Sequence, residues 1–264
     1  MNLLDKKIFN ILEDLKENYH AKSIKAEFGA EGTLLEEALR LKEFAAKTDL
    51  DFTIKIGGCE AVRDIYDSKS VGINSLVAPM IETSYAMKKY VNSIKSIFSQ
   101  EEQNKINFFI NIETYTGCIN LKSITEAKEF SALKGIVLGR SDMADSINMS
   151  KNDLDSDKMS DIANKMSSEM KKLGKDMIIG GGISPKSVSF LQKIPYLTNF
   201  ETRKIIFNSK VLSNTVSAEV GIIRAIDFER LWIINRRENY GIIKNNDNER
   251  LQFLEKLLNE SIKI

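Results

Sequence analysis

Two acidic side chains near the middle of the chain could hold a divalent metal ion. Glu113 follows the apolar run 108–112, and Asp142 follows the apolar run 135–138 and a short glycine turn. If both runs are neighbouring strands, the two carboxylates could bind one Mg²⁺ or Mn²⁺ ion, with water and substrate oxygens completing its coordination. Such an ion would act as a Lewis acid on an α-keto carboxylate and stabilise its enolate. The alternative is that Glu113 forms an ordinary ion pair with a Lys or Arg.

Basic residues also follow predicted strands. Lys55 could position a substrate anion, or form a Schiff base with a carbonyl group if burial lowers its pKa; alternatively it neutralises nearby glutamates. Lys25 lies two residues before Glu27 and is expected on the same side of its strand. Arg203 could bind a substrate carboxylate at the ends of the predicted strands, or it could pair with Glu201.

Glycine turns follow two of the predicted strands. The run 180–182 could bind a phosphate or carboxylate through its backbone N–H groups. The alternative is a tight turn that allows close packing. Because Thr114, Gly139 and Arg140 adjoin the two acids, we expect them, together with Lys55, to contact the substrate.

These side chains can meet only if the strands that carry them lie side by side. Short apolar segments alternate with helix-like segments of roughly 10–20 residues, which predicts a parallel sheet covered by helices on both faces. The strand candidates are 23–28, 52–56, 73–78, 107–113, 135–138, 177–180 and part of 197–207. The helix candidates are 3–19, 33–45, 59–68, 83–98, 120–130, 155–173, 185–193, 214–237 and 247–262.

This alternation predicts an α/β fold: a single (β/α)8 TIM-type barrel over 1–264, with an N-terminal helix and extra C-terminal helices from about 214 to 262. Seven strand candidates are visible, so either an eighth is hidden in a weak segment or 197–207 contributes more than one. An open doubly wound sheet is the alternative. In a parallel barrel the βα loops converge at one mouth, where the charged and glycine residues would meet. The C-terminal helices would pack across the barrel bottom or against another subunit.

The composition excludes several classes of protein. The chain has 264 residues and a formal net charge of +1, so it lacks the basic field that nucleic-acid-binding proteins usually carry. No run approaches the ~18 apolar residues of a membrane span, and the N-terminus has no apolar signal core. Two cysteines are too few for a secreted disulfide framework. We therefore expect a cytoplasmic protein with no nucleic-acid or membrane partner.

Three motifs together resemble the HpcH/HpaI aldolase and citrate lyase family. They are Ile-Glu-Thr-Tyr-Thr-Gly at 112–117, the segment 135–144 with its Gly-Arg-Ser-Asp turn, and the segment 77–83. Family members typically show an "IET..G" strand end followed by "G..lG..DL". The resemblance covers roughly residues 23 to 150, and the order and spacing of the motifs make it more specific than any one of them.

The resemblance implies a (β/α)8 barrel that binds pyruvate or an acyl-like enolate on a divalent metal. The metal carboxylates of the family would fall on Glu113 and Asp142. The Arg that binds the substrate carboxylate and stabilises the enolate would fall on Lys55, which keeps the charge but loses the bidentate guanidinium.

A second departure concerns the catalytic base. Aldolases of this family often use a His in an "EHG" motif, and the matching place here reads Glu27-Phe28-Gly29. The only histidine, His20, precedes the first strand. Glu27, Glu31, Glu60 or a metal-bound water would have to replace the missing base, with Glu27 favoured.

The expected function is therefore a metal-dependent carbon–carbon lyase or aldolase acting on a small α-keto acid. Glu113 and Asp142 would hold Mg²⁺ or Mn²⁺, Lys55 and Arg203 would position the substrate anion, and Glu27 would be the acid/base. One alternative is a catalytically altered barrel that serves as a keto-acid- or metal-binding regulatory subunit; another is a Schiff-base aldolase using Lys55. We expect a homo-oligomer.

Overall fold

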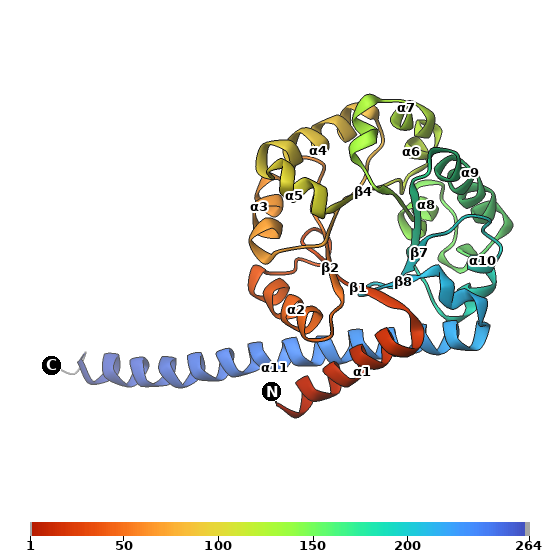
Figure 1. Ribbon diagram of the computed structural model, residues 1–264. Helices are drawn as coiled ribbons and strands as arrows, with labels where there is room; N and C mark the ends of the chain where they lie inside the picture. Colours follow the sequence, from red (N-terminus) through yellow and green to blue (C-terminus); the bar gives the residue numbers. More distant parts are fainter. Residues whose placement is uncertain (1, 262–264) are drawn as a thin grey trace.

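Eight strands form a closed barrel in chain order, and helices surround it (Figure 1). The computed structural model describes residues 2–261. The strands are β1 (Ala21–Glu27), β2 (Asp51–Lys55), β3 (Ser75–Ala78), β4 (Asn107–Asn111), β5 (Gly135–Gly139), β6 (Asp176–Gly180), β7 (Asn199–Glu201) and β8 (Ile205–Asn208). The predicted TIM-type barrel is confirmed, and the open sheet is excluded.

The helices alternate with the strands as far as β7. They are α1 (Leu3–Tyr19), α2 (Leu35–Lys47), α3 (Val62–Val71), α4 (Ser84–Ile97), α5 (Gln100–Lys105), α6 (Tyr115–Ile119), α7 (Leu121–Thr125), α8 (Arg140–Ser146), α9 (Asp157–Leu173), α10 (Val188–Gln192) and α11 (Thr215–Ser261). Four short 3₁₀ turns are η1 (Lys128–Ala132), η2 (Lys151–Asp153), η3 (Pro185–Ser187) and η4 (Ser209–Ser213).

The strands are apolar on both sides because both sides are buried. Val77, Phe109, Val137 and Ile178, from β3 to β6, pack against one another as a separate cluster. The intervening residues of the same strands, such as Ile110, belong to the much larger core that includes the surrounding helices. This two-sided burial explains why the central strands show no polar alternation.

The last part of the barrel differs from the (β/α)8 pattern. Strands β1 to β7 run parallel, whereas β8 is antiparallel to both β7 and β1. Only residues 202–204 separate β7 from β8, too few for the crossover that a parallel pair needs. The chain therefore turns back in a hairpin, in which the Thr202 amide donates to the Ile205 carbonyl at 2.9 Å. The segment 197–207 thus contributes two strands, and the hairpin tip replaces an eighth βα loop.

The C-terminal segment forms one continuous helix. The sequence predicts separate helices at 214–237 and 247–262, but α11 runs unbroken from Thr215 to Ser261, and residue 262 lies outside the described residues. Its first half packs along α1, and its second half extends beyond the barrel (Figure 1). Gly221 allows the close approach, because a Cβ atom there would lie 2.9 Å from Tyr19 Cβ.

No helix in the described part of the chain combines the length and the apolarity needed to span a lipid bilayer.

Candidate active site

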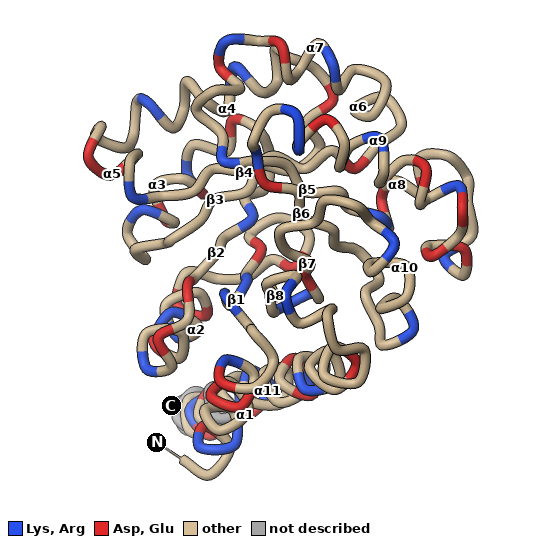
Figure 2. The backbone as a smooth tube through the Cα atoms, turned by 45° about the vertical axis from the view of Figure 1, so that its right-hand side comes forward, with Lys and Arg blue, Asp and Glu red and all other residues tan. Residues whose placement is uncertain are grey.

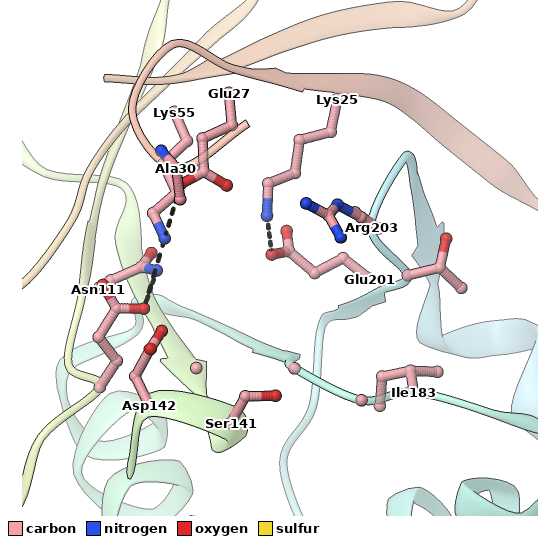
Figure 3. Close-up of a pocket in the computed structure, with 15 residues that line it drawn as sticks. Lys25, Glu27, Ala30, Lys55, Asn111, Ser141, Asp142, Ile183, Glu201 and Arg203 are labelled. Carbon is pink, nitrogen blue, oxygen red and sulfur yellow. Dashed lines mark hydrogen bonds and ion pairs between the residues drawn. The ribbon is translucent and has the colours of Figure 1, made fainter. Parts of the chain in front are cut away.

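A cavity of about 390 Å³ lies where the carboxyl ends of the parallel strands converge. Figure 2 shows basic and acidic positions of the chain within the ring of strands as well as on the outer helices. Charged side chains from β1, β2, β7 and the turns after β4, β5 and β7 line the cavity (Figure 3): Lys25, Glu27, Lys55, Glu113, Asp142, Glu201 and Arg203. The structure therefore brings together, at one mouth, charged residues that are far apart in the sequence.

Glu113 follows β4 by two residues and is fixed by two hydrogen bonds. Its side chain is only 2% exposed; its Oε1 accepts from the Met80 amide at 2.9 Å and its Oε2 accepts from Asn111 Nδ2 at 2.7 Å. A Cβ atom on Gly139, the last residue of β5, would lie 2.5 Å from Glu113 Oε2. Glycine at position 139 is therefore what lets this carboxylate reach across to the neighbouring strand.

Asp142 lies in the first turn of α8 and faces Glu113. The two carboxyl groups line the same cavity, and the charge of Glu113 acts on Asp142. Burial and the negative charge of Glu113 together raise the pKa of Asp142, and Lys55 opposes this rise. Two facing carboxylates repel each other unless a proton or a cation lies between them.

Lys55 supplies one positive charge beside these acids. Its Nζ is 3.5 Å from Glu27 Oε1 and 3.6 Å from Glu113 Oε2. Burial alone would lower the pKa of Lys55, but the charges of Glu113, Glu27, Glu201 and Asp142 outweigh burial and raise it. Because a Schiff base forms from a neutral amine, this environment favours an electrostatic role for Lys55 over a nucleophilic one.

The residues present fit a divalent cation held by two carboxylates. Among the residues that the structure describes, no cluster of three or more His, Cys, Asp or Glu side chains surrounds a metal-sized space. A two-carboxylate site is nevertheless ordinary for Mg²⁺, which usually keeps several waters or substrate oxygens. Glu113 and Asp142 would be the two carboxylates of such a site.

Asn111 is a site residue that the sequence reasoning missed. It is 3% exposed and lines the cavity. Its Nδ2 donates to Glu113, but its buried Oδ1 has no hydrogen-bond partner among the residues that the structure describes. A buried acceptor without a partner is unfavourable, so this oxygen is available to a ligand. The sequence does indicate Asn111: it is a polar residue in an otherwise apolar strand. Because it lies two positions before Glu113, it is on the same side of the strand as that acid.

The opposite side of the cavity contains a complete ion pair. Lys25 Nζ contacts Glu201 Oε1, and the two side chains are 10% and 6% exposed. Glu201 fits because residue 180 is glycine: a Cβ atom on Gly180 would lie 2.7 Å from Glu201 Cγ. The Glu201–Arg203 pair considered from the sequence is therefore wrong, since Glu201 pairs with Lys25.

Arg203 reaches the mouth from the tip of the β7–β8 hairpin. Its Nε donates to Glu31 Oε1 at 2.9 Å, while its side chain remains 61% exposed. The neighbouring Lys204 also contacts Glu31. Burial alone would raise the pKa of Glu31, but the two cations hold it below its ordinary value. The Glu31 contacts thus tie the hairpin to the loop after β1.

Two residues expected to contact the substrate face elsewhere, which corrects that expectation. Arg140 is fully buried: its Nε donates to the Gly181 carbonyl at 3.1 Å, and its Nη1 contacts Asp155. Thr114 caps α6, where its Oγ1 accepts from the Gly117 amide at 3.1 Å. Neither side chain lines the cavity, because each sits in a turn that directs it toward a neighbouring loop.

The glycine turn after β6 borders the cavity. Gly181 and Gly182 have φ values of +81° and +63°. A Cβ atom on Gly181 would also lie 2.6 Å from the Ser141 amide nitrogen. Close packing between the loops after β5 and β6 therefore explains these glycines without an anion.

The other candidates for the missing base lie outside the cavity. His20 directly precedes β1, at the opposite end of that strand from Glu27. Glu60 pairs with Lys89 at 2.6 Å and does not line the cavity. Glu27 remains beside Lys55 at the mouth.

Comparisons with known proteins show a family match and the same barrel fold. A model of the HpcH/HpaI aldolase/citrate lyase family matches residues 21–178. No curated protein matches the sequence significantly.

Solved structures share the barrel at low sequence identity. A family protein from Burkholderia cenocepacia J2315 is 11% identical over 86% of this chain and 90% of its own, with a TM-score of 0.63. An HpcH/HpaI aldolase from Desulfitobacterium hafniense DCB-2 is 10% identical over 76% and 83%, with a TM-score of 0.59. The citrate synthase SbnG is 13% identical over 83% and 90%, with a TM-score of 0.56.

At these identities the structures establish the fold, whereas the family match itself covers more than half of the sequence. The chain therefore belongs to the HpcH/HpaI aldolase/citrate lyase family.

Proposed function

We propose that this protein is a metal-dependent carbon–carbon lyase or aldolase that acts on the enolate of a small α-keto acid. The observation that carries the proposal is the facing pair of carboxylates, Glu113 and Asp142, with the unpartnered Asn111 oxygen beside them. The family match supports the reaction class. The cavity of about 390 Å³ is in the ordinary range for a small-molecule site.

Glu113 and Asp142 would hold Mg²⁺ or Mn²⁺, and the bound ion would supply the positive charge that stabilises an enolate. Lys55 binds and orients the carboxylate of the keto acid, because its ammonium group stays charged among the acids around it. Asn111 Oδ1 accepts a hydrogen bond from the ligand or its water. Together these groups fix the keto acid in one orientation at the strand ends.

Glu27 is the proposed acid/base. Its carboxylate lines the cavity and lies 3.5 Å from Lys55 Nζ. In the cleavage direction it removes the proton of the substrate hydroxyl, the carbon–carbon bond breaks, and an aldehyde or ketone leaves. The same carboxyl group then returns the proton to the enolate carbon to give the keto acid. This role replaces that of the histidine expected from the family motif.

Proton exchange tests the enolate step without knowledge of the second substrate. Pyruvate is mixed with protein and Mg²⁺ in deuterated water, and loss of the methyl proton signal is followed by NMR. We expect exchange that stops with EDTA and falls at least about 100-fold in Glu113→Gln. Glu60→Gln is the matched control, because Glu60 pairs with Lys89 outside the cavity. Absence of exchange with pyruvate and longer keto acids would refute the proposed chemistry.

A regulatory subunit that binds the metal or keto acid is the second candidate. It is favoured by the position of the chain's only histidine, His20, outside the cavity. Metal-dependent binding of pyruvate without exchange would support this role. Borohydride trapping tests the Schiff-base alternative, and the raised pKa of Lys55 leads us to expect no adduct.

A further inference from the structure

Arg140 is a buried cation that the proposed chemistry does not use. Its side chain is 0% exposed and is the largest one that the described part of the chain buries completely. Burial lowers the pKa of Arg140, and the hydrogen bond and charge of Asp155 oppose this lowering. Removing a guanidinium from water is unfavourable unless its partners replace the lost water on every side. The contacts of Arg140 therefore indicate what the charge holds together.

The guanidinium of Arg140 joins two loops that border the cavity. In the loop after β5, it donates from Nη1 to the Leu154 carbonyl at 3.2 Å and contacts Asp155. In the loop after β6, it donates from Nε to the Gly181 carbonyl at 3.1 Å, and its Nη2 lies 3.5 Å from Ser187 Oγ. Ser187 in turn donates to the other Asp155 oxygen at 3.0 Å. All three guanidinium nitrogens are used, so the group is fixed in both position and orientation.

Arg140 and Asp142 share the first turn of α8 but project from opposite sides of it. Each helical residue turns the chain by about 100°, so side chains two residues apart point about 200° apart. Asp142 accordingly lines the cavity, whereas Arg140 does not. A rotation of this turn would move both side chains together. Anchoring the guanidinium on the outer side therefore fixes the direction of the carboxylate on the inner side.

The backbone of the same turn is also packed against the loop after β6. A Cβ atom on Gly181 would lie 2.7 Å from the Arg140 amide nitrogen and 2.6 Å from that of Ser141. The glycine loop thus touches the start of α8 directly, while its carbonyl accepts from the Arg140 side chain. Main chain and side chain together hold the turn against this loop.

The two carboxylates proposed to bind the metal are positioned in different ways. Glu113 accepts hydrogen bonds from the Met80 amide and from Asn111 Nδ2. Of the residues that the structure describes, no backbone amide or side-chain amide donates in this way to Asp142, and burial and nearby charges are what act on its carboxyl group. The position of Asp142 must therefore come from the turn that carries it.

We propose that Arg140 is a positioning residue, whose contacts with the loops after β5 and β6 hold the turn that presents Asp142 to the metal ion. The inference rests on the proposed function, because it requires Glu113 and Asp142 to be the metal ligands. It adds that Arg140 and Asp155, neither of which lines the cavity, contribute to metal affinity. Groups that hold metal ligands in place typically contribute roughly 10- to 100-fold to that affinity.

A matched pair of substitutions in one loop tests the anchor from a distance. Asp155→Asn keeps the size of the side chain but removes the charge that pairs with Arg140, and we expect Mg²⁺ binding to weaken about tenfold. Asp153→Asn makes the same charge change two residues away, at an exposed position, and should change the affinity less than about twofold. Isothermal titration calorimetry measures both. Equal effects of the two substitutions would overturn the proposal, because they would reflect only the lost negative charge.

Arg140→Lys tests the guanidinium itself. Lysine keeps the positive charge, but one ammonium group cannot contact both loops as the planar guanidinium does. We expect Mg²⁺ binding to weaken at least about tenfold. Leu12→Ala, a change in the buried core of α1, is the control for lost stability and should lower the melting temperature without changing Mg²⁺ affinity. An Arg140→Lys variant that melts earlier but binds Mg²⁺ like the wild type would show that Arg140 only stabilises the fold.

Amide hydrogen exchange of the metal-free protein separates this inference from the proposed function. In Arg140→Lys, exchange should accelerate together in α8 and in residues 181–187, because the two loops lose their common anchor. Unchanged protection of α8 would reject the anchoring, whatever the protein catalyses. A wild-type protein that binds Mg²⁺ without exchanging pyruvate protons would refute the proposed chemistry alone, and the change in Mg²⁺ affinity would still decide the role of Arg140.

Discussion

Both sides of the cavity carry acidic side chains at the ends of strands, but their negative charges are neutralised to different extents. On the β4–β5 side, Glu113 and Asp142 face each other, with one Lys55 ammonium 3.6 Å from Glu113. On the β1–β7 side, Lys25 and Glu201 form a buried one-to-one ion pair. The β1–β7 pair is electrically complete, whereas the β4–β5 pair retains an excess of negative charge. Such an excess in a recessed site is unfavourable unless a cation or proton joins it.

Glycine produces the space on both sides. Gly139 makes room for Glu113, and Gly180 makes room for Glu201. On both sides, a glycine on the neighbouring strand makes room for a glutamate. The two sides differ in the partners of each carboxylate. We interpret the β1–β7 side as a structural wall and the β4–β5 side as the reacting side. Three substitutions test this difference, beginning with the largest expected effect.

Breaking the Lys25–Glu201 pair should destabilise the protein strongly. Lys25→Met leaves Glu201 buried without its partner, and we expect a loss of about 3–5 kcal/mol in the free energy of unfolding. Urea denaturation measures this loss. Lys47→Met, which breaks the exposed pair with Glu43, is the control and should cost less than about 1 kcal/mol.

The double variant Lys25→Met/Glu201→Gln should recover much of that loss, because no unpaired charge remains. A loss below about 1 kcal/mol in Lys25→Met would instead mean that water solvates Glu201 well. The β1–β7 side would then not be a closed structural wall, and the comparison would fail.

Removing Lys55 should change two binding constants in opposite directions. The Lys55 ammonium occupies the electrostatic field of Glu113 and Glu27, so it repels a metal ion and attracts a carboxylate. In Lys55→Met we expect Mg²⁺ to bind roughly tenfold more tightly and the keto acid roughly tenfold more weakly. Isothermal titration calorimetry measures both. Lys89→Met, outside the cavity, should change neither. Weaker Mg²⁺ binding in Lys55→Met would contradict the proposed charge balance.

The residues on the β4–β5 side of the cavity could be predicted from the sequence, because each belongs to a short local pattern. Glu113 and Asp142 each follow an apolar strand directly, so their convergence followed from the strand ends of a parallel barrel. The same reasoning placed Lys55 and Glu27 at the mouth. The closing hairpin was harder to predict, because 197–207 contains two strands of three and four residues with only three between them.

The remaining features of the site depend on contacts between residues that are far apart in the sequence, or on the direction of a side chain in a turn. Lys25 and Glu201 come from strands at opposite ends of the sequence, and the ring closure alone brings them together. Arg140 is only two residues from Asp142, yet the turn directs it toward Asp155. Strand position could therefore be predicted from the sequence, but the direction of a side chain in a turn and its distant partner could not.

The smallest expected effect concerns the repulsion between the two facing acids. Asp142 has a pKa above its ordinary value of 3.8, so between those two pKa values the folded state binds more protons than the unfolded state. The free energy of unfolding therefore falls as pH rises through that window. At pH 7, without metal, Asp142→Asn removes the repulsion and should raise the melting temperature by ~2 °C. The effect is small because the side chain is partly open to solvent.

Two conditions decide whether that gain comes from the facing carboxylates. As the pH falls through the raised pKa of Asp142, the gain should disappear, because the wild-type Asp142 carboxylate then becomes protonated and uncharged. Saturating Mg²⁺ should reverse the order of stability, since a bound ion stabilises only the protein that retains both carboxylates. Differential scanning calorimetry in EDTA and in Mg²⁺ measures both comparisons, with Asp161→Asn, an exposed position on α9, as the control. An Asp142→Asn variant that Mg²⁺ stabilises as much as wild type would show that the ion does not bind between Asp142 and Glu113. The excess negative charge of the β4–β5 side would then need another explanation.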